Sequence, residues 1–158
     1  MSQTISLTLN GSSRHFAISL GETLLEVLRR ESLKSVKLGC DTGDCGACAV
    51  LVDGRAVNAC MVLAVATAGC SVTTVEGLEQ DGRLHRLQEA LLDAGGVQCG
   101  FCSPGMVVAA VDLLSRNPHP TEAEVREGLA GNLCRCTGYV KPVDAILAAS
   151  AAAEEARP

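Results

Sequence analysis

Gln98-Cys99-Gly100-Phe101-Cys102-Ser103-Pro104-Gly105 places two thiols just before the Ser-Pro pair at which a helix is expected to begin. A second stretch, Gly131-Asn132-Leu133-Cys134-Arg135-Cys136, carries two more thiols close to a glycine. Glycine near thiolates lets backbone N–H groups approach the sulfur atoms, because no Cβ stands in the way. The two stretches together predict one small metal centre with four ligands, Cys99, Cys102, Cys134 and Cys136.

A second set of four cysteines lies nearer the N-terminus. Cys40, Cys45 and Cys48 follow the C-x4-C-x2-C spacing with which plant-type ferredoxins hold a [2Fe–2S] cluster. Cys60 comes after a tight hairpin that can fold it back as the fourth ligand, although ordinary plant-type ferredoxins take their last ligand from much further along the chain. Four thiolates also suit tetrahedral zinc, so a structural zinc site is the alternative at this point.

Composition and charge exclude several classes of protein. The 158 residues suffice for one ordinary domain or two small ones, and small domains often need metal ions for stability. A net charge of −5 argues against nucleic acid or an anionic membrane as partner. No apolar run approaches the roughly 18 residues that span a bilayer, and residues 1–5 do not resemble a signal peptide. Nine cysteines in such a chain indicate metal or redox chemistry in a reducing compartment, so we expect a cytoplasmic protein.

The first half of the sequence alternates apolar and polar residues, as a half-buried sheet does. The elements expected there are a hairpin over residues 3–20, a helix over 22–31, a second hairpin over 49–58 and a last strand over 72–75. The dipeptide Asp53-Gly54 is a strong signal for a two-residue hairpin turn. The glycine-containing loop over residues 38–48 carries the first three cysteines.

After Gly77 the pattern changes to helical spacing. Glu79-Gln80-Asp81-Gly82 is polar and is expected to be a linker. Four helices are expected beyond it, over residues 84–94, 103–116, 121–129 and 142–153. Thr121 with Glu124 three residues later forms a capping-box signature. The predicted fold class is α+β, with a sheet-containing domain of residues 1–78 followed by an all-α four-helix domain of residues 79–158.

Other candidate sites are weaker. Cys99 and Cys102 alone could form a dithiol redox motif, but that motif is expected after a strand, whereas a helix precedes it here. Cys70 belongs to neither quartet and is expected to be a spare thiol. His85 is expected to be solvated. No Ser/His/Asp or Cys/His arrangement is evident, so substrate catalysis is not expected on this chain.

The two halves together resemble the iron–sulfur subunit of the molybdenum hydroxylases, the family of xanthine dehydrogenase and of bacterial carbon monoxide, aldehyde and N-heterocycle dehydrogenases. The resemblance runs from residue 3 to residue 150 and is carried by Gly39–Cys48, Cys60, Gln98–Gly105 and Gly131–Tyr139. Ser103 departs from the threonine of many relatives, but the hydroxyl is kept. Because these motifs lie in both halves, the resemblance covers nearly the whole chain.

The resemblance implies a ferredoxin-like β-grasp domain and a four-helix domain, each with one [2Fe–2S] cluster. It implies that Gln98 contacts the molybdopterin cofactor of a separate large subunit. It further implies a medium subunit that binds FAD, and a hetero-oligomer such as a dimer of heterotrimers. The implied function is electron transfer within a molybdenum-containing oxidoreductase: electrons pass from molybdenum through both clusters to FAD or another acceptor, while substrate reacts on the large subunit.

Two other functions remain possible from the residues alone. The chain can be a free-standing two-cluster ferredoxin, or a zinc-stabilised interaction module with no redox role. If Gln98 faces the pterin, the cluster of Cys99, Cys102, Cys134 and Cys136 lies nearer molybdenum. The cluster on Cys40, Cys45, Cys48 and Cys60 is then expected to be the more exposed one and to face the next carrier.

Overall fold

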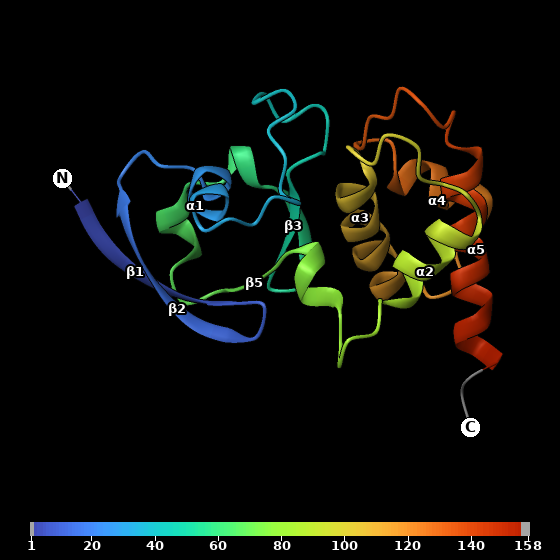
Figure 1. Cartoon of the computed structure of the whole chain (residues 1–158), viewed down its shortest axis with the longest axis horizontal. Helices are drawn as coiled ribbons and strands as arrows, with labels where there is room; N and C mark the ends of the chain where they lie inside the picture. Colours follow the sequence, from blue (N-terminus) through green and yellow to red (C-terminus); the bar gives the residue numbers. More distant parts are fainter. Residues whose placement is uncertain (1, 156–158) are drawn as a thin grey trace.

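A computed structural model describes residues 2–155 and divides them into a sheet-containing half and a helical half. Figure 1 shows the sheet and helix α1 (Leu24–Arg30) on one side and the later helices on the other, with α3 (Ser103–Arg116) lying against β3 (Ala49–Val52). The two halves are in direct contact. The expected α+β class is confirmed.

The first hairpin consists of β1 (Ser2–Leu9) and β2 (Ser12–Ser19), paired antiparallel. Asn10 and Gly11 form the turn, with φ of 47° and 79°. Positive φ at both turn residues matches the right-handed twist of the strands, which explains why Asn-Gly is suited to this position. Alternate apolar residues are buried; Ile5 on β1 lies opposite Phe16 on β2. The expected hairpin is confirmed.

Within residues 2–155, the sheet has five strands in the order β2-β1-β5-β3-β4. The second hairpin joins β3 (Ala49–Val52) to β4 (Arg55–Asn58), and β5 (Ser71–Thr73) runs parallel to β1 and antiparallel to β3. Helix α1 (Leu24–Arg30) begins at Thr23, which forms a capping box with Glu26. Its buried residues face the hairpin, so one helix is held against a mixed sheet.

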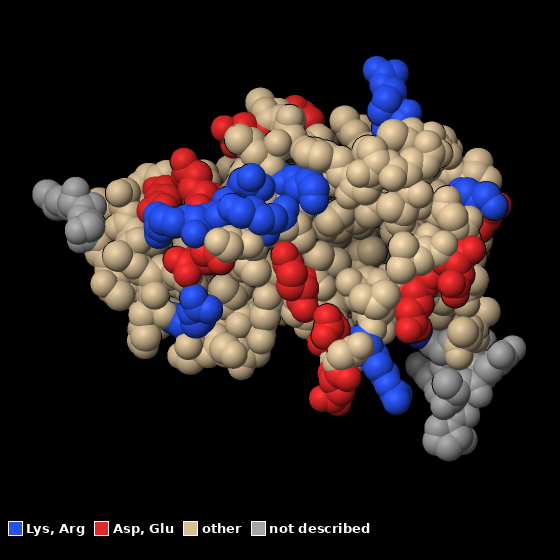
Figure 2. Space-filling view, in the orientation of Figure 1, with Lys and Arg blue, Asp and Glu red and all other residues tan. Residues whose placement is uncertain are grey.

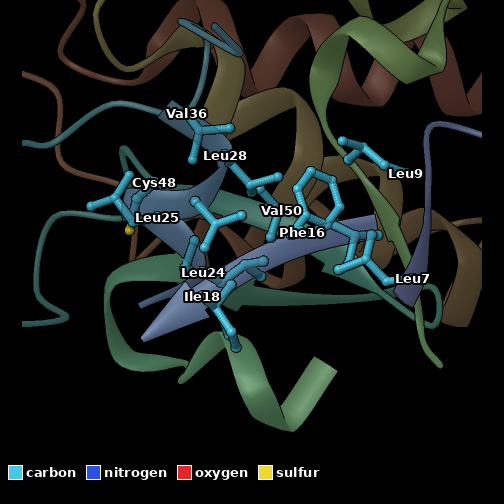
Figure 3. Packing of buried hydrophobic residues seen from close by; sticks show 14 of the residues in the cluster. Leu7, Leu9, Phe16, Ile18, Leu24, Leu25, Leu28, Val36, Cys48 and Val50 are labelled. Carbon is cyan, nitrogen blue, oxygen red and sulfur yellow. The ribbon is translucent and has the colours of Figure 1, made fainter. Parts of the chain in front are cut away.

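The core of this half lies between α1 and the sheet. Leu24 and Leu28 are fully buried there, and each such leucine contributes about 1.5–3 kcal/mol by leaving water. Figure 3 shows Cys48 at the edge of the same core, on the side away from Phe16. The loop over residues 38–48, called the first cysteine loop below, is therefore attached directly to the hydrophobic core.

Three short 3-10 helices were not expected from the sequence: η1 (Ala59–Met61), η2 (Ala64–Thr67) and η3 (Val75–Leu78). The strand expected over 72–75 ends at Thr73 instead. Its successor Thr74 gives its N–H to the Asn10 side chain, and the chain then turns into η3. The Asn10 side chain, in the turn between β1 and β2, thus accepts the Thr74 N–H that would otherwise have extended the strand pairing of β5.

The helical half contains α2 (Arg86–Asp93), α3 (Ser103–Arg116), α4 (Glu122–Gly128) and α5 (Val140–Glu155), as expected. The predicted capping box of Thr121 and Glu124 is present. His85 was wrongly expected to be solvated: its Nδ1 accepts the N–H of Leu87 and caps α2, while burial lowers its pKa. Among the described residues, no helix combines the length and apolar character needed to cross a membrane.

The two halves meet where the sheet packs on α3. Val108 of α3 is buried against β3. Beside it, the Asp112 carboxylate accepts from Arg55 of β4 at 2.9 Å and from Arg116 at 3.1 Å, with its side chain only 10% exposed. Two guanidinium groups compensate the buried charge. This contact holds α3, and the cysteine at its start, against the sheet.

Charge is distributed unevenly over the surface. Figure 2 shows basic side chains gathered over α1 and the segment that follows it, which leads into the first cysteine loop. Acidic side chains adjoin them in the same view, and Arg30 of α1 forms an ion pair with Glu22.

Candidate metal centres

The first cysteine loop directs backbone N–H groups at a thiol. The N–H groups of Thr42 and Cys45 point at Cys40 Sγ, at 3.5 and 3.4 Å. Contacts with Thr42 and then with the Cys45 N–H lower the pKa of Cys40 to about 6. Asn58 of β4 steadies the loop by donating to the Gly43 carbonyl at 2.7 Å. These contacts favour the thiolate form of Cys40, whereas burial raises the pKa of Cys45 in the same loop.

Cys48 and Cys60 form a second pair beneath this loop. Cys60 lies in η1, directly after the hairpin, and the Ala59 N–H donates to the Cys48 carbonyl at 3.3 Å. Both residues are buried. Burial, together with the neighbouring Cys60 thiol, raises the pKa of Cys48 to about 11. The hairpin therefore returns Cys60 to the loop, as the sequence predicted.

In the helical half, Cys102 stands at the start of α3 and lies beside Cys134. Burial, followed by contact with the Cys134 thiol, raises the pKa of Cys102 to about 12. Cys134 differs, because Thr137 donates to its sulfur from the hydroxyl at 3.1 Å and from the N–H at 3.4 Å. Burial opposes these bonds, yet they lower the pKa of Cys134 to about 7.

Cys99 and Cys136 form the fourth pair, with their sulfur atoms 3.7 Å apart. Both are exposed. The Gln98 side chain donates to the Cys136 carbonyl at 3.2 Å and so links the two cysteine stretches of this half. Gln98 itself is exposed, at the edge of the quartet. A partner surface can therefore reach both Gln98 and this pair.

The eight thiols thus meet in twos: Cys40 with Cys45, Cys48 with Cys60, Cys99 with Cys136, and Cys102 with Cys134. A tetrahedral zinc needs four donors around one point, whereas each iron of a [2Fe–2S] cluster takes two thiolates. The paired arrangement therefore fits two binuclear clusters better than two zinc ions.

The prediction that the quartet of Cys40 is more exposed than the quartet of Cys99 was wrong. None of the first four cysteines is exposed, whereas Cys99 and Cys136 of the second quartet are. The reason is that Cys48 and Cys60 belong to the sheet-and-helix core, while Cys99 and Cys136 lie in loops outside the helical core. The exposed edge of the second quartet is the edge that carries Gln98.

A contact that sequence reasoning missed joins the two quartets. The Leu133 N–H donates to the Cys45 carbonyl at 2.9 Å, and the Asn132 side chain donates to the Gly46 carbonyl at 3.1 Å. A Cβ added to Gly105 would lie 2.3 Å from the Gly46 carbonyl oxygen, so the start of α3 also touches this loop. The glycines near the cysteines were visible in the sequence, but their packing against one another was not.

Cys70 lies away from these pairs. It precedes β5 and contacts Asp53, at the turn that follows β3, whereas Cys48 stands at the other end of β3. The Asp53 carboxylate raises the pKa of the Cys70 thiol. Its position agrees with a thiol that belongs to neither quartet.

Two family models match the chain. Residues 7–71 match a 2Fe-2S iron-sulfur cluster binding domain, and residues 74–147 match a [2Fe-2S] binding domain. Each match contains one of the two cysteine quartets. The two iron–sulfur domains that the family resemblance implied are therefore present.

Among curated relatives, the nicotinate dehydrogenase small FeS subunit of Eubacterium barkeri is 46% identical, over 87% of this chain and 88% of the relative. The xanthine dehydrogenase iron-sulfur-binding subunit of Escherichia coli O157:H7 is also 46% identical, over 91% and 92%. A chain of quinoline 2-oxidoreductase from Pseudomonas putida 86 superposes with a TM-score of 0.93 at 42% identity, covering 99% of both chains. These relatives span both halves.

The aldehyde oxidoreductase of Desulfovibrio desulfuricans superposes with a TM-score of 0.92 at 43% identity, over 97% of this chain but only 17% of its own. The same two-domain unit thus occurs both as a separate subunit and as part of a longer oxidoreductase chain. The paired thiols, the two [2Fe–2S] domain matches and these relatives lead to one conclusion. The chain belongs to the family of small iron–sulfur subunits of the molybdenum hydroxylases, the electron-transferring subunits of these oxidoreductases.

Proposed function

We propose that the eight paired cysteines are the ligands of two [2Fe–2S] clusters, one held by Cys40, Cys45, Cys48 and Cys60 and the other by Cys99, Cys102, Cys134 and Cys136. The observation that carries the proposal is the meeting of these thiols in four pairs. When bound, such clusters accept and release single electrons. The N–H and hydroxyl groups aimed at Cys40 and Cys134 stabilise negative charge on sulfur.

The division into domains 1–78 and 79–158 belongs to the same proposal. It is supported by the change from strands to helices after η3, and by matches that run to residue 71 and from residue 74. Val75 and Leu78 of η3 pack against the helical core, so this short helix is the joint between the domains. Residues 1 and 156–158 of the proposed ranges lie outside the described part.

The proposed partner is a large subunit that carries molybdopterin and the substrate site, reached through the exposed edge of the second quartet. Gln98 stands at that edge with an amide that can both donate and accept hydrogen bonds. Electrons then enter at the quartet of Cys99 and leave from that of Cys40, towards FAD on a medium subunit or towards another acceptor. The proposed assembly is a cytoplasmic hetero-oligomer, for example a dimer of heterotrimers.

The order of the relay can be tested in the assembled enzyme. Magnetic coupling between Mo(V) and each reduced cluster, measured by EPR, is expected to be stronger for the cluster of Cys99. Gln98→Ala should leave both clusters assembled but slow electron transfer from molybdenum several-fold, or weaken association with the large subunit. Gln80→Ala, an exposed glutamine in the linker, is the control and should change neither. Stronger coupling to the cluster of Cys40 would reverse the proposed order.

Hydrogen bonds to sulfur should set the potential of the second cluster. Thr137→Val removes the hydroxyl that lies 3.1 Å from Cys134 Sγ, and with it one donor that stabilises the more negative reduced state. The reduction potential of that cluster is expected to fall by on the order of 20–60 mV, the one-electron equivalent of one ordinary hydrogen bond. Thr137→Ser keeps the hydroxyl and is the control. If an EPR-monitored redox titration gives both variants the same reduction potential as the unmodified chain, the Thr137 hydroxyl does not set the potential of the second cluster.

A further inference from the structure

Asn132 is a buried polar residue between the two quartets. Its residue is 5% exposed, and its backbone N–H is fixed to the Leu129 carbonyl at the end of α4. Its side-chain nitrogen donates to the Gly46 carbonyl at 3.1 Å. That carbonyl also accepts the Ala49 N–H at 3.1 Å, so it is bonded from within its own loop and from the opposite domain.

The amide occupies a space that exists only because two glycines lack a side chain. A Cβ on Gly46 would lie 2.5 Å from the Asn132 nitrogen, and a Cβ on Gly105 would lie 3.1 Å from it. The Asn132 side chain is therefore enclosed by the first cysteine loop on one side and by the start of α3 on the other. Such close packing leaves the amide little freedom to move.

Asn132 and its neighbour Leu133 donate hydrogen bonds to two adjacent backbone carbonyls of the first cysteine loop. Leu133 donates its N–H to Cys45 at 2.9 Å, while the Asn132 amide donates to Gly46. One hydrogen bond fixes a distance but permits rotation about itself; two bonds between neighbouring residues also fix the orientation. The two accepting carbonyls belong to Cys45 and Gly46, and the donor Leu133 directly precedes Cys134. The two hydrogen bonds therefore connect the loop around one cysteine of each quartet.

We propose that Asn132 is a positioning residue for electron transfer between the two quartets. Its amide holds the Cys45 loop in one orientation against the Cys134 loop and so sets the electronic coupling between the two centres. This inference rests on the proposed two-cluster function. Other contacts hold the domains together without it, namely the ion pair between Arg55 of β4 and Asp112 of α3 and the packing of Val108 on β3. Loss of the amide should therefore change the coupling without separating the domains.

The test compares two isosteric substitutions in the full chain loaded with iron and sulfide. Asn132→Asp removes the donor and sets a carboxylate oxygen against the Gly46 carbonyl. Asn58→Asp makes the same change to the bond with Gly43, which lies in the same loop but does not cross to the other domain. Arg55→Ala weakens the domain contact away from the cysteines and is the second control. Asn132→Ala serves if the aspartate variant does not load its clusters.

Two readouts are taken. The first is the EPR splitting that appears when both clusters are reduced together. The second is deuterium exchange at the Leu133 amide, followed by mass spectrometry. In the Asn132 variants the splitting should shrink or vanish and the Leu133 amide should exchange several-fold faster, while the signals of the separate clusters persist. In Asn58→Asp and Arg55→Ala, the EPR splitting and the exchange rate of the Leu133 amide should both stay as in the unmodified chain.

Splitting and Leu133 exchange in the Asn132 variants equal to those of Arg55→Ala would overturn the positioning role and leave the two-cluster function standing. If the unmodified chain shows no splitting, the exchange of Leu133 decides alone. An unmodified chain that binds no iron would instead count against the proposed function itself, so the two failures are distinguishable.

Discussion

Gly105→Ala is expected to lower the free energy of unfolding by about 3 kcal/mol, which is near the upper end for overpacking a well-packed site. The added methyl group would lie 2.3 Å from the Gly46 carbonyl oxygen, and this obstacle is backbone rather than a flexible side chain. Either α3 or the first cysteine loop must move; the loop carries proposed cluster ligands, and the proposed ligand Cys102 directly precedes α3. The thermal midpoint of the loaded chain should fall by roughly 6–12 °C.

The matched control is Gly131→Ala, next to Asn132 in the same junction. A Cβ at Gly131 meets no atom within 4 Å. The thermal midpoint of Gly131→Ala should therefore be close to that of the unmodified chain. Equal midpoints for Gly105→Ala and the unmodified chain would contradict the close approach of α3 to the cysteine loop.

Cys60→Ser is expected to halve the iron content. Cys60 is buried and paired with Cys48, and a serine hydroxyl there does not replace the thiolate that a [2Fe–2S] cluster requires. The first cluster should be lost or altered, with its EPR signal, while the second remains. Iron should then fall from about four to about two atoms per chain.

Cys70→Ser is the control for that experiment, because Cys70 contacts Asp53 and belongs to neither quartet. Its iron, sulfide and both EPR signals should match those of the unmodified chain. Loss of half the iron in Cys70→Ser, or full iron in Cys60→Ser, would mean that the ligands are wrongly assigned.

Local chemistry made much of the fold predictable. Asn10-Gly11 and Asp53-Gly54 are turns whose residues tolerate positive φ, and both hairpins occur where these dipeptides indicate. The capping box at Thr121 likewise depends on residues only three positions apart. The cysteine spacings belong to the same class of signal, since each pattern is confined to a short loop.

What could not be predicted depends on segments far apart in the chain. Asn132 and Gly46 are 86 positions apart, and nothing in either stretch alone indicates that they bond. The pairing of Cys99 with Cys136 is likewise set by how α3 and the later loop pack. The relative exposure of the two quartets was misjudged because the first quartet, in a glycine-containing loop, was expected to be the more exposed one, whereas attachment to the hydrophobic core decides exposure.

The central claim is that this chain holds two [2Fe–2S] clusters, and metal analysis of the purified chain combined with EPR tests it most directly. About four iron and four sulfide per chain are expected, with two distinct rhombic EPR signals on reduction. Stoichiometric zinc in a colourless protein without those signals would contradict it.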